Sequence, residues 1–329
     1  MSVIFKQVSL FIVIALLAAT SGCTLTPHHA IAQNNLQYLE SKTTAELNEG
    51  VFGNDWKPIH VAAKQGNIDA INILIRKGVE LNALTFFGAA DSCVTPLQLA
   101  IANNQAKAAE ILIKAGAAVD LQNSHGVTPL ATAVGIDNLE LAKFLLDLNA
   151  DPDIKNINGV TPLMLAVQRN KLEMVKLLLS AGADINSTKN GSNVSTPLIE
   201  STANDSVSFE ITEFLVQNGA NLNLVSSKGD SALHFAVSKS NYSKVNLLIA
   251  NKADLNVVSA SGLSALHIAT INRNKIIIES LLDHEANPNI LGLNQTTPIQ
   301  EAAFSSNNDS VKLLIKAGAD VNHRNANGL

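Results

Sequence analysis

Three histidines are the residues of this sequence whose recurrence most resembles a reactive or metal-binding set. His60 ends the tetrad KPIH, and His234 and His267 end two copies of SALH. Imidazole nitrogens bind metals and exchange protons near neutral pH, so a row of histidines at one repeated position raises the question of a metal site. A position that recurs inside a repeated motif is explained by the motif itself, and we therefore expect these side chains to have a structural role.

The other polar residues do not form a catalytic signature. The sequence contains no GxGxxG, GxxxxGK[ST], HExxH, GxSxG or CxxC motif, and these are common signs of nucleotide binding, metal-assisted hydrolysis and nucleophilic catalysis. Five aspartates follow predicted helix ends and are interpreted as turn residues rather than as acid–base pairs; they are Asp151, Asp153, Asp184, Asp254 and Asp320. We expect no enzymatic activity, no cofactor, no metal and no small-molecule substrate.

One cysteine has a context that predicts covalent modification. The chain begins with Lys6 and an apolar run from Val8 to Ala19. This run is shorter than the roughly 20 residues that an ordinary membrane-spanning helix needs, and its flanks are typical of a secretory signal. The next stretch, TSGC, ends at Cys23 and resembles the lipobox of bacterial lipoproteins, in which the cysteine is lipidated after cleavage. Thr20 departs from that pattern, which usually has Leu there.

The resemblance implies a signal peptide at residues 1–22, acyl chains such as palmitate on Cys23, and a lipid-anchor linker at residues 23–33. Two or more acyl chains anchor a protein stably to a membrane. Thr24 lacks the Asp that favours inner-membrane retention in that family, so we expect an outer-membrane anchor facing the periplasm. An alternative stays open, because Ala30-Ile31-Ala32 fits the A-x-A pattern of ordinary signal cleavage. Cleavage after Ala32 would release a soluble periplasmic protein.

Composition excludes other classes of function. The formal net charge is -5 and no run of five or more like charges occurs, whereas nucleic-acid binders usually carry a clustered basic face. Aromatic residues make up only 4% of a chain that is 47% hydrophobic, so the core must consist of Leu, Ile, Val and Ala. Cys93 is the remaining cysteine; with lipid on Cys23, no internal disulfide can form and packing must provide the stability.

A repeated tetrad shows how the chain is organised. The tetrads KPIH, TPLQ, TPLA, TPLM, TPLI, SALH, SALH and TPIQ begin at Lys57, Thr95, Thr128, Thr161, Thr196, Ser231, Ser264 and Thr297. Successive spacings are 38, 33, 33, 35, 35, 33 and 33 residues. A period near 33 residues over most of the chain predicts a repeat array rather than two globular domains.

Each copy reads as a pair of helices. Thr or Ser at the first position of the tetrad is an N-cap, and Pro follows where its missing N–H has no cost. A small residue four positions after the Pro predicts close helix approach; it is Ala in seven copies and Ser201 in one. A second apolar helix then ends at Gly, which takes the left-handed C′ conformation. Asn149, Lys252 and Glu285 replace this Gly, and we expect strained or looser ends at Lys252 and Glu285.

The stretches GVTPLMLAV and LLLSAGADIN resemble the ankyrin repeat closely. The resemblance covers residues 54–329, about eight copies and the start of a ninth, and residues 34–53 are predicted to cap the first copy. It implies an all-α solenoid of stacked antiparallel helix pairs with β-hairpin-like fingers. It also implies that the recurring His is a hydrogen-bonding residue beside the cap.

The resemblance implies that fingers and inner helices form a concave face that binds another protein. By position in the fingers, the candidate contact residues are Phe86, Phe87, Asn123, His125, Asn156, Asn158, Lys189, Lys228 and Asn294. Phe86 and Phe87 lie in a finger five residues longer than the others, and are either interface anchors or part of the packing. Cys93 in the same finger is either an accessible free thiol or a buried one.

The function expected from these observations is a non-enzymatic scaffold on the cell envelope that binds a partner protein. Two alternatives remain: a protective binder of a toxin or periplasmic enzyme, similar to an immunity protein or a chaperone, and a host-directed effector. A lipobox argues against the effector, because it retains the protein at the membrane.

Overall fold

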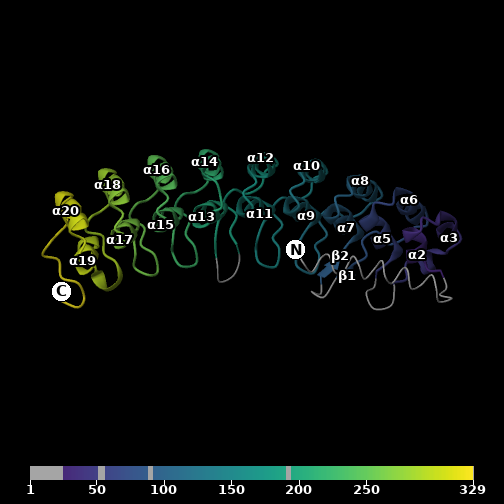
Figure 1. Cartoon of the computed structure of the whole chain (residues 1–329), viewed down its shortest axis with the longest axis horizontal. Helices are drawn as coiled ribbons and strands as arrows, with labels where there is room; N and C mark the ends of the chain where they lie inside the picture. Colours follow the sequence, from purple (N-terminus) through teal and green to yellow (C-terminus); the bar gives the residue numbers. More distant parts are fainter. Residues whose placement is uncertain (1–24, 51–55, 88–91, 190–193, 329) are drawn as a thin grey trace. The chain divides into compact units, whose positions relative to one another are not determined.

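The computed structural model describes residues 25–50, 56–87, 92–189 and 194–328, shown in Figure 1. Cys23 lies outside the described residues. The chain divides into two compact units, residues 1–150 and 151–329, and each unit is described by itself. None of the helices in the described part of the chain is long and apolar enough to cross a bilayer.

The first unit consists of short helices and one two-stranded hairpin. Its elements are α2 (Pro27–Ala32), α3 (Leu36–Glu40), α4 (Thr44–Leu47), α5 (Pro58–Gln65), α6 (Ile68–Arg76), β1 (Thr85–Phe87), β2 (Ser92–Val94), α7 (Pro96–Ala102), α8 (Ala106–Lys114), α9 (Pro129–Gly135) and α10 (Leu139–Asp147). Helices α2, α5, α7 and α9 contact one another in that order and form one layer, while α3, α6 and α8 form a second layer. β1 pairs antiparallel with β2.

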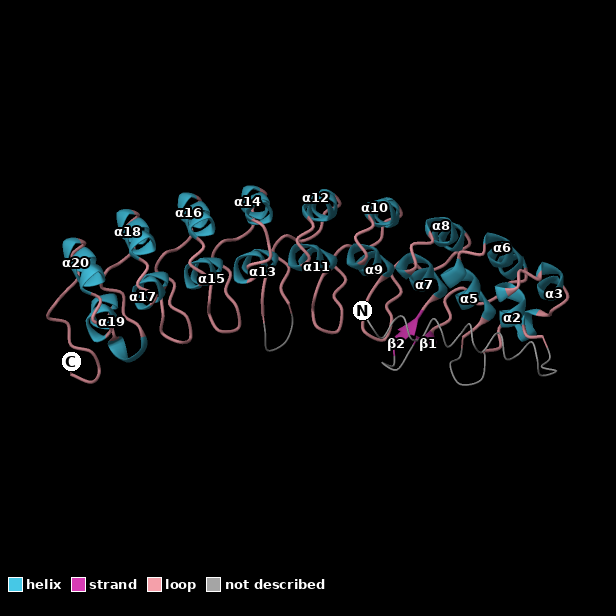
Figure 2. Cartoon of the chain, viewed as in Figure 1, coloured by secondary structure: helices cyan, strands magenta, loops and turns pink. Residues whose placement is uncertain are grey.

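The second unit repeats the same helix pair five times. Its elements are α11 (Pro162–Gln168), α12 (Leu172–Ser180), α13 (Pro197–Ala203), α14 (Phe209–Gln217), α15 (Ala232–Ser238), α16 (Tyr242–Ala250), α17 (Ala265–Ile271), α18 (Lys275–Asp283), the 3-10 turn η2 (Leu293–Gln295), α19 (Pro298–Phe304) and α20 (Asn308–Lys316). The first helices of successive pairs contact each other, as do the second helices. The loops between pairs extend from the first-helix layer, away from the second helices (Figure 2). This arrangement confirms the predicted all-α solenoid.

The helix starts follow the predicted chemistry. Thr128 accepts a hydrogen bond from the backbone N–H of Ala131 at 3.1 Å, and Thr161 accepts one from Met164 at 3.3 Å. Each is followed by Pro at the first helical position. The small residues that were expected to permit close packing are fully buried; they are Ala62, Ala100, Ala133, Ala166, Ser201, Ala236, Ala269 and Ala302.

The helix ends adopt the left-handed conformation that was predicted from glycine. Gly182 follows α12 with φ 90°, a region that favours residues without a Cβ. Asn149, Lys252 and Glu285 occupy the same position with φ of 61°, 64° and 67°. Lys252 and Glu285 therefore hold a backbone conformation that is uncommon for residues of their type, in line with the expectation of strain.

A ladder of Asn and Asp side chains links neighbouring repeats. In the second unit Asp153 accepts the backbone N–H of Asp184 at 2.9 Å, and Asn256 accepts that of Asn287 at 2.9 Å. Asp151 in turn accepts the N–H of Asp153 at 2.8 Å. Such side-chain bonds to nearby backbone define Asx turns, so the prediction of turn aspartates is confirmed.

The fifth repeat accommodates its two extra residues with a buried lysine. The insertion after α13 leaves the carbonyls of Ser201 and Val207 turned toward α16, and the Nζ of Lys244 donates to them at 2.6 and 2.8 Å. Lys244 is 2% exposed, and burial lowers its pKa. Because a buried carbonyl without a donor is costly, Lys244 explains how this irregular repeat keeps its packing.

The segment 23–33, predicted as a lipid-anchor linker, contains the helix α2 at residues 27–32. Thr26 caps α2 by accepting the N–H of His29 at 3.3 Å, and Pro27 follows it. Ala30 and Ile31 are buried, at 0% and 1% exposure, and α2 packs on α5. The ring Nε2 of His28 lies 2.6 Å from the carbonyl oxygen of Trp56. Residues 25–32 are therefore part of the folded array.

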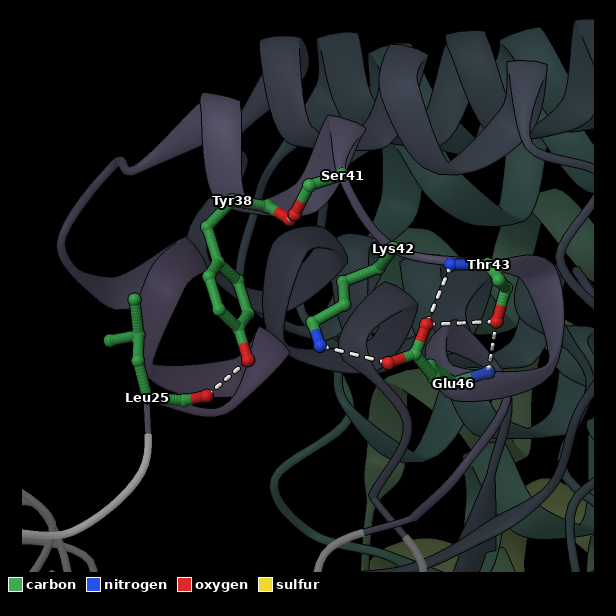
Figure 3. Close-up of polar contacts among 6 residues, drawn as sticks. All are labelled: Leu25, Tyr38, Ser41, Lys42, Thr43 and Glu46. Carbon is green, nitrogen blue, oxygen red and sulfur yellow. Dashed lines mark hydrogen bonds and ion pairs between the residues drawn. The ribbon is translucent and has the colours of Figure 1, made fainter.

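Helices α2, α3 and α4 together form a divergent repeat in front of α5. Helix α3 packs on α6 as the later second helices pack on each other, and Leu39 and Leu47 are fully buried. The phenol of Tyr38 in α3 donates to the carbonyl of Leu25, which fixes the start of the segment (Figure 3). A capping role for this part of the chain agrees with these contacts.

The end of the capping segment is fixed by one carboxylate. Glu46 accepts hydrogen bonds from the N–H and the hydroxyl of Thr43 at 2.8 and 2.9 Å, and pairs with Lys42 at 2.8 Å (Figure 3). Its hydrogen bond with Lys42 and those with Thr43 lower the pKa of Glu46 to about 2. Asn48 then accepts the N–H of Glu80 at 3.0 Å, which joins the cap to the first repeat.

Candidate partner-binding surface

In each unit the repeats leave one side uncovered, and we call this side the finger-side surface. We define it as the loops between helix pairs together with positions four and seven after each N-cap on the first helices. Position four is half-buried or buried, and position seven becomes exposed at several repeats, for example at Ile271 and Phe304. The second helices cover the opposite side of the first-helix layer (Figure 2).

Backbone hydrogen bonds join neighbouring fingers within each unit. In the first unit the backbone N–H of Cys93 donates to the side-chain hydroxyl of Ser124 at 2.9 Å. In the second unit Ala260 donates to the carbonyl of Lys228 at 2.8 Å, and Ala326 donates to that of Asn294 at 2.8 Å. These bonds fix the backbone of the fingers that they join.

The first long finger contains the predicted aromatic pair. In the backbone register of β1 and β2, Phe86 lies opposite Cys93 and Phe87 lies opposite Ser92. The tip of this finger, residues 88–91, lies outside the described residues. Cys93 is a free thiol of intermediate exposure, between the two states that the sequence left open.

Two of the predicted contact residues have their side-chain oxygens engaged inside the turns. The Oδ1 of Asn123 accepts the N–H groups of His125 and Val127, each at 2.9 Å. Asn156 does the same with Asn158 and Val160, at 2.9 and 3.0 Å. These hydrogen bonds within the turns explain why Asn123 and Asn156 are asparagines. Asn158 is exposed and His125 is half-buried.

The remaining predicted residues differ in their surroundings. The ammonium of Lys189 lies 3.6 Å from the carboxylate of Glu200, with both side chains less than one-fifth exposed. Lys228 is exposed on its finger, and Asn294 is exposed with φ 55° within η2. That these residues contact a partner stays a prediction.

Sequence reasoning missed an apolar set on the first helices of the second unit. Phe235 and Ile268 lie half-buried at position four of α15 and α17. Ile271 and Phe304, at position seven of α17 and α19, are 45% and 62% exposed. The signal was present in the spacing, because position seven is Lys64, Ala102, Gly135, Gln168, Ala203 or Ser238 in the other repeats and carries a large apolar side chain only at Ile271 and Phe304.

The recurring histidines are part of the helix starts and not of a reactive set. Nδ1 of His60 accepts the N–H of Lys57 at 3.2 Å, and Nε2 lies 2.9 Å from the carbonyl of Ala83, to which it donates. Burial lowers the pKa of His60 to about 4, so the ring is neutral at pH 7. His234 and His267 have the same pair of backbone contacts. Both ring nitrogens of each are occupied, which confirms the structural interpretation.

Stacked helix pairs with loops on one side of each unit define a helical repeat protein. The chain belongs to the ankyrin-repeat family: a model for a single ankyrin repeat matches residues 54–83, and a model for three ankyrin repeats matches residues 81–156, 97–189, 163–259 and 233–325. Ankyrin repeats indicate a protein–protein interaction scaffold. A comparison with curated proteins found no match.

Proposed function

We propose that this protein is a non-enzymatic scaffold of the cell envelope that binds a partner protein through its finger-side surface. The observation that carries the proposal is the exposure of Ile271 and Phe304 on successive first helices, beside half-buried Ile268. Apolar and aromatic side chains that are exposed together are typical of interaction sites, and large aromatic anchors supply much of the energy of protein interfaces.

The test compares the two faces of two neighbouring repeats. Ile271→Ser with Phe304→Ser removes the apolar side chains of the finger side, and Ile276→Ser removes one of similar exposure, 57%, from α18 in the second-helix layer. In crosslinking of the native envelope followed by mass spectrometry, we expect the double variant to lose its crosslinked partner and the Ile276 variant to keep it. Equal crosslinking by the two variants would contradict the assignment of the face.

The envelope location rests on Cys23, which is proposed to carry lipid after cleavage of residues 1–22. The described part of the chain supports cleavage there over cleavage after Ala32. Removal of residues up to Ala32 would delete α2, whose Ala30 and Ile31 are buried against the array. A signal peptide is removed from the folded protein, so a helix that belongs to the packing is better placed downstream of the cleavage site.

The anchor is tested by the mass of the mature chain and by fractionation. We expect an acylated N-terminus at Cys23, and we expect Cys23→Ala to shift the protein out of the membrane fraction. A free N-terminus at Gln33 would contradict both the anchor and the retention of α2. The assignment of the binding face does not depend on this result, because Ile271 and Phe304 lie far from Cys23 in sequence.

A further inference from the structure

A pocket on the finger-side surface of the second unit has a chemistry that identifies one kind of ligand group. It lies between α15 and α17 and has a volume of about 320 Å³. Four apolar residues and four polar residues line it; they are Phe235, Leu263, Ile268 and Ile271, and Asp230, His234, Ser238 and Asn272. This volume is at the lower end of ligand sites and fits one long side chain rather than a larger molecule.

Asp230 is the one acidic residue that lines the pocket, and the fold does not require an acid there. The equivalent residue directly before the N-cap is Val94, Val127, Val160 or Leu263 in four other repeats. The backbone of Asp230 completes the turn, since its N–H donates to the hydroxyl of Ser226 at 3.2 Å. Its carboxylate makes no ion pair or hydrogen bond with any residue that the structure describes.

The neighbouring basic groups do not neutralise Asp230. His234 accepts the N–H of Ser231 through Nδ1 at 3.2 Å, while its Nε2 lies 3.0 Å from the carbonyl of Leu263 and donates to it. Burial lowers the pKa of His234, so this ring stays neutral at pH 7. Lys239 is paired with Asp205 at 3.0 Å. Ser238 and Asn272 are uncharged, so the pocket combines apolar and neutral polar walls with one negative charge.

We infer that this pocket binds a single cationic side chain, Arg or Lys, from the partner protein. Arg and Lys place an aliphatic stem along apolar surface and keep the charged head at a polar edge. Here the stem contacts Ile268 and Ile271 and the head pairs with Asp230. The face of Phe235 adds an attractive surface for a guanidinium. The inference rests on the proposed function and names the chemistry of its partner.

The probe is N-acetyl-arginine amide, titrated into the mature chain labelled at the isoleucine and leucine methyl groups. We expect methyl shifts at Ile268, Ile271 and Leu263, and weakening on added salt. N-acetyl-citrulline amide has the same shape without the charge, and we expect about five-fold weaker binding from it. Asp230→Asn should reduce arginine binding to the citrulline level.

Asp230→Val, which installs the residue of other repeats, provides a second variant that is compatible with the fold. It should retain the thermal transition and lose the preference for arginine over citrulline. Arginine binding that Asp230→Asn and Asp230→Val leave unchanged would overturn the inference, as would methyl shifts located away from the pocket.

Envelope crosslinking separates this inference from the proposed function. If both hold, Asp230→Asn weakens the partner crosslink that Ile271→Ser with Phe304→Ser abolishes. A crosslink that depends on Ile271 and Phe304 but not on Asp230 would overturn the inference and leave the scaffold intact. A partner crosslink that depends on none of Asp230, Ile271 and Phe304 would overturn the scaffold surface itself. The titration with the arginine probe would still test the pocket separately.

Discussion

The buried histidines give the protein a specific pH dependence. An unfolded His takes up a proton near pH 6.5, while His60 in the folded chain resists protonation down to about pH 4 because it is buried. The unfolded state therefore binds more protons between these values, and stability falls as pH decreases from 6.5 toward 4. Burial also lowers the pKa of His234 and His267, so their contributions have the same sign.

Glutamine provides the matched control for this titration. Gln98 holds the same position in the second repeat, where its Oε1 accepts the N–H of Thr95 at 3.0 Å and its Nε2 donates to the carbonyl of Val127 at 2.7 Å. We expect His60→Gln to fold and to lose less stability than the natural chain between pH 6.5 and 4, by on the order of 1–3 kcal/mol. Urea unfolding at several pH values measures this difference, and parallel curves for the two chains would contradict it.

Lys252 offers a test of backbone strain at a helix end. Its φ is 64° at the second residue after α16, a conformation that costs a residue with a Cβ about 1 kcal/mol or more. Lys252→Gly is expected to raise the free energy of unfolding by about 0.5–1 kcal/mol, despite the added freedom of Gly in the unfolded chain. Asn251→Gly, one residue earlier at φ -96°, should lower it. A rise in both variants, or in neither, would show that strain does not limit this end.

At the scale of elements, the helix pairs were predictable because their signals are local. An N-cap followed by Pro, a small residue and a terminal Gly are each recognised from a few neighbouring residues of the sequence. The structure confirms them at Thr161, Ala166 and Gly182. Lys244 was not predictable, because its role depends on carbonyls 37 and 43 residues away. The apolar set at Ile271 and Phe304 follows from helical spacing, but its exposure depends on which neighbours leave it uncovered.

The first helix, α2, was missed for a different reason. Thr26-Pro27 begins α2 as the other cap-and-Pro pairs begin their helices, but α2 has 6 residues where α7 has 7. The residue after Pro27 is His28 rather than an aliphatic residue. A shortened helix beside a predicted signal peptide reads as a linker until the packing of Ala30 and Ile31 on the array is seen.

Truncation tests the place of α2 in the fold. A chain that begins at Gln33 lacks Ala30 and Ile31, which are 0% and 1% exposed, and leaves their partners on α5 uncovered. We expect it to be less stable than a chain that begins at Leu25, by about 2–5 kcal/mol, as for loss of a large buried side chain. Thermal unfolding of the two chains measures the difference. Equal transitions would show that α2 adds nothing, and would remove the structural argument against cleavage after Ala32.

At the scale of the whole molecule, contacts between neighbours govern stability. In a repeat array each repeat contacts only its neighbours, so stability is close to a sum of local terms and neighbour interfaces. The two compact units divide the chain at residues 150 and 151, and each has its own buried aliphatic core. A defect in the core of one unit is therefore expected to act mainly within that unit.

Two leucines on second helices allow this expectation to be tested symmetrically. Leu112 in α8 of the first unit and Leu281 in α18 of the second are both fully buried. Each Leu→Ala change should cost about 2–5 kcal/mol locally. In hydrogen exchange, Leu281→Ala should reduce protection in α17 to α20 and leave α5 to α8 unchanged, and Leu112→Ala should do the reverse. A uniform loss of protection along the chain in either variant would mean that the units unfold as one cooperative body, because local coupling alone cannot carry a defect over so many repeats.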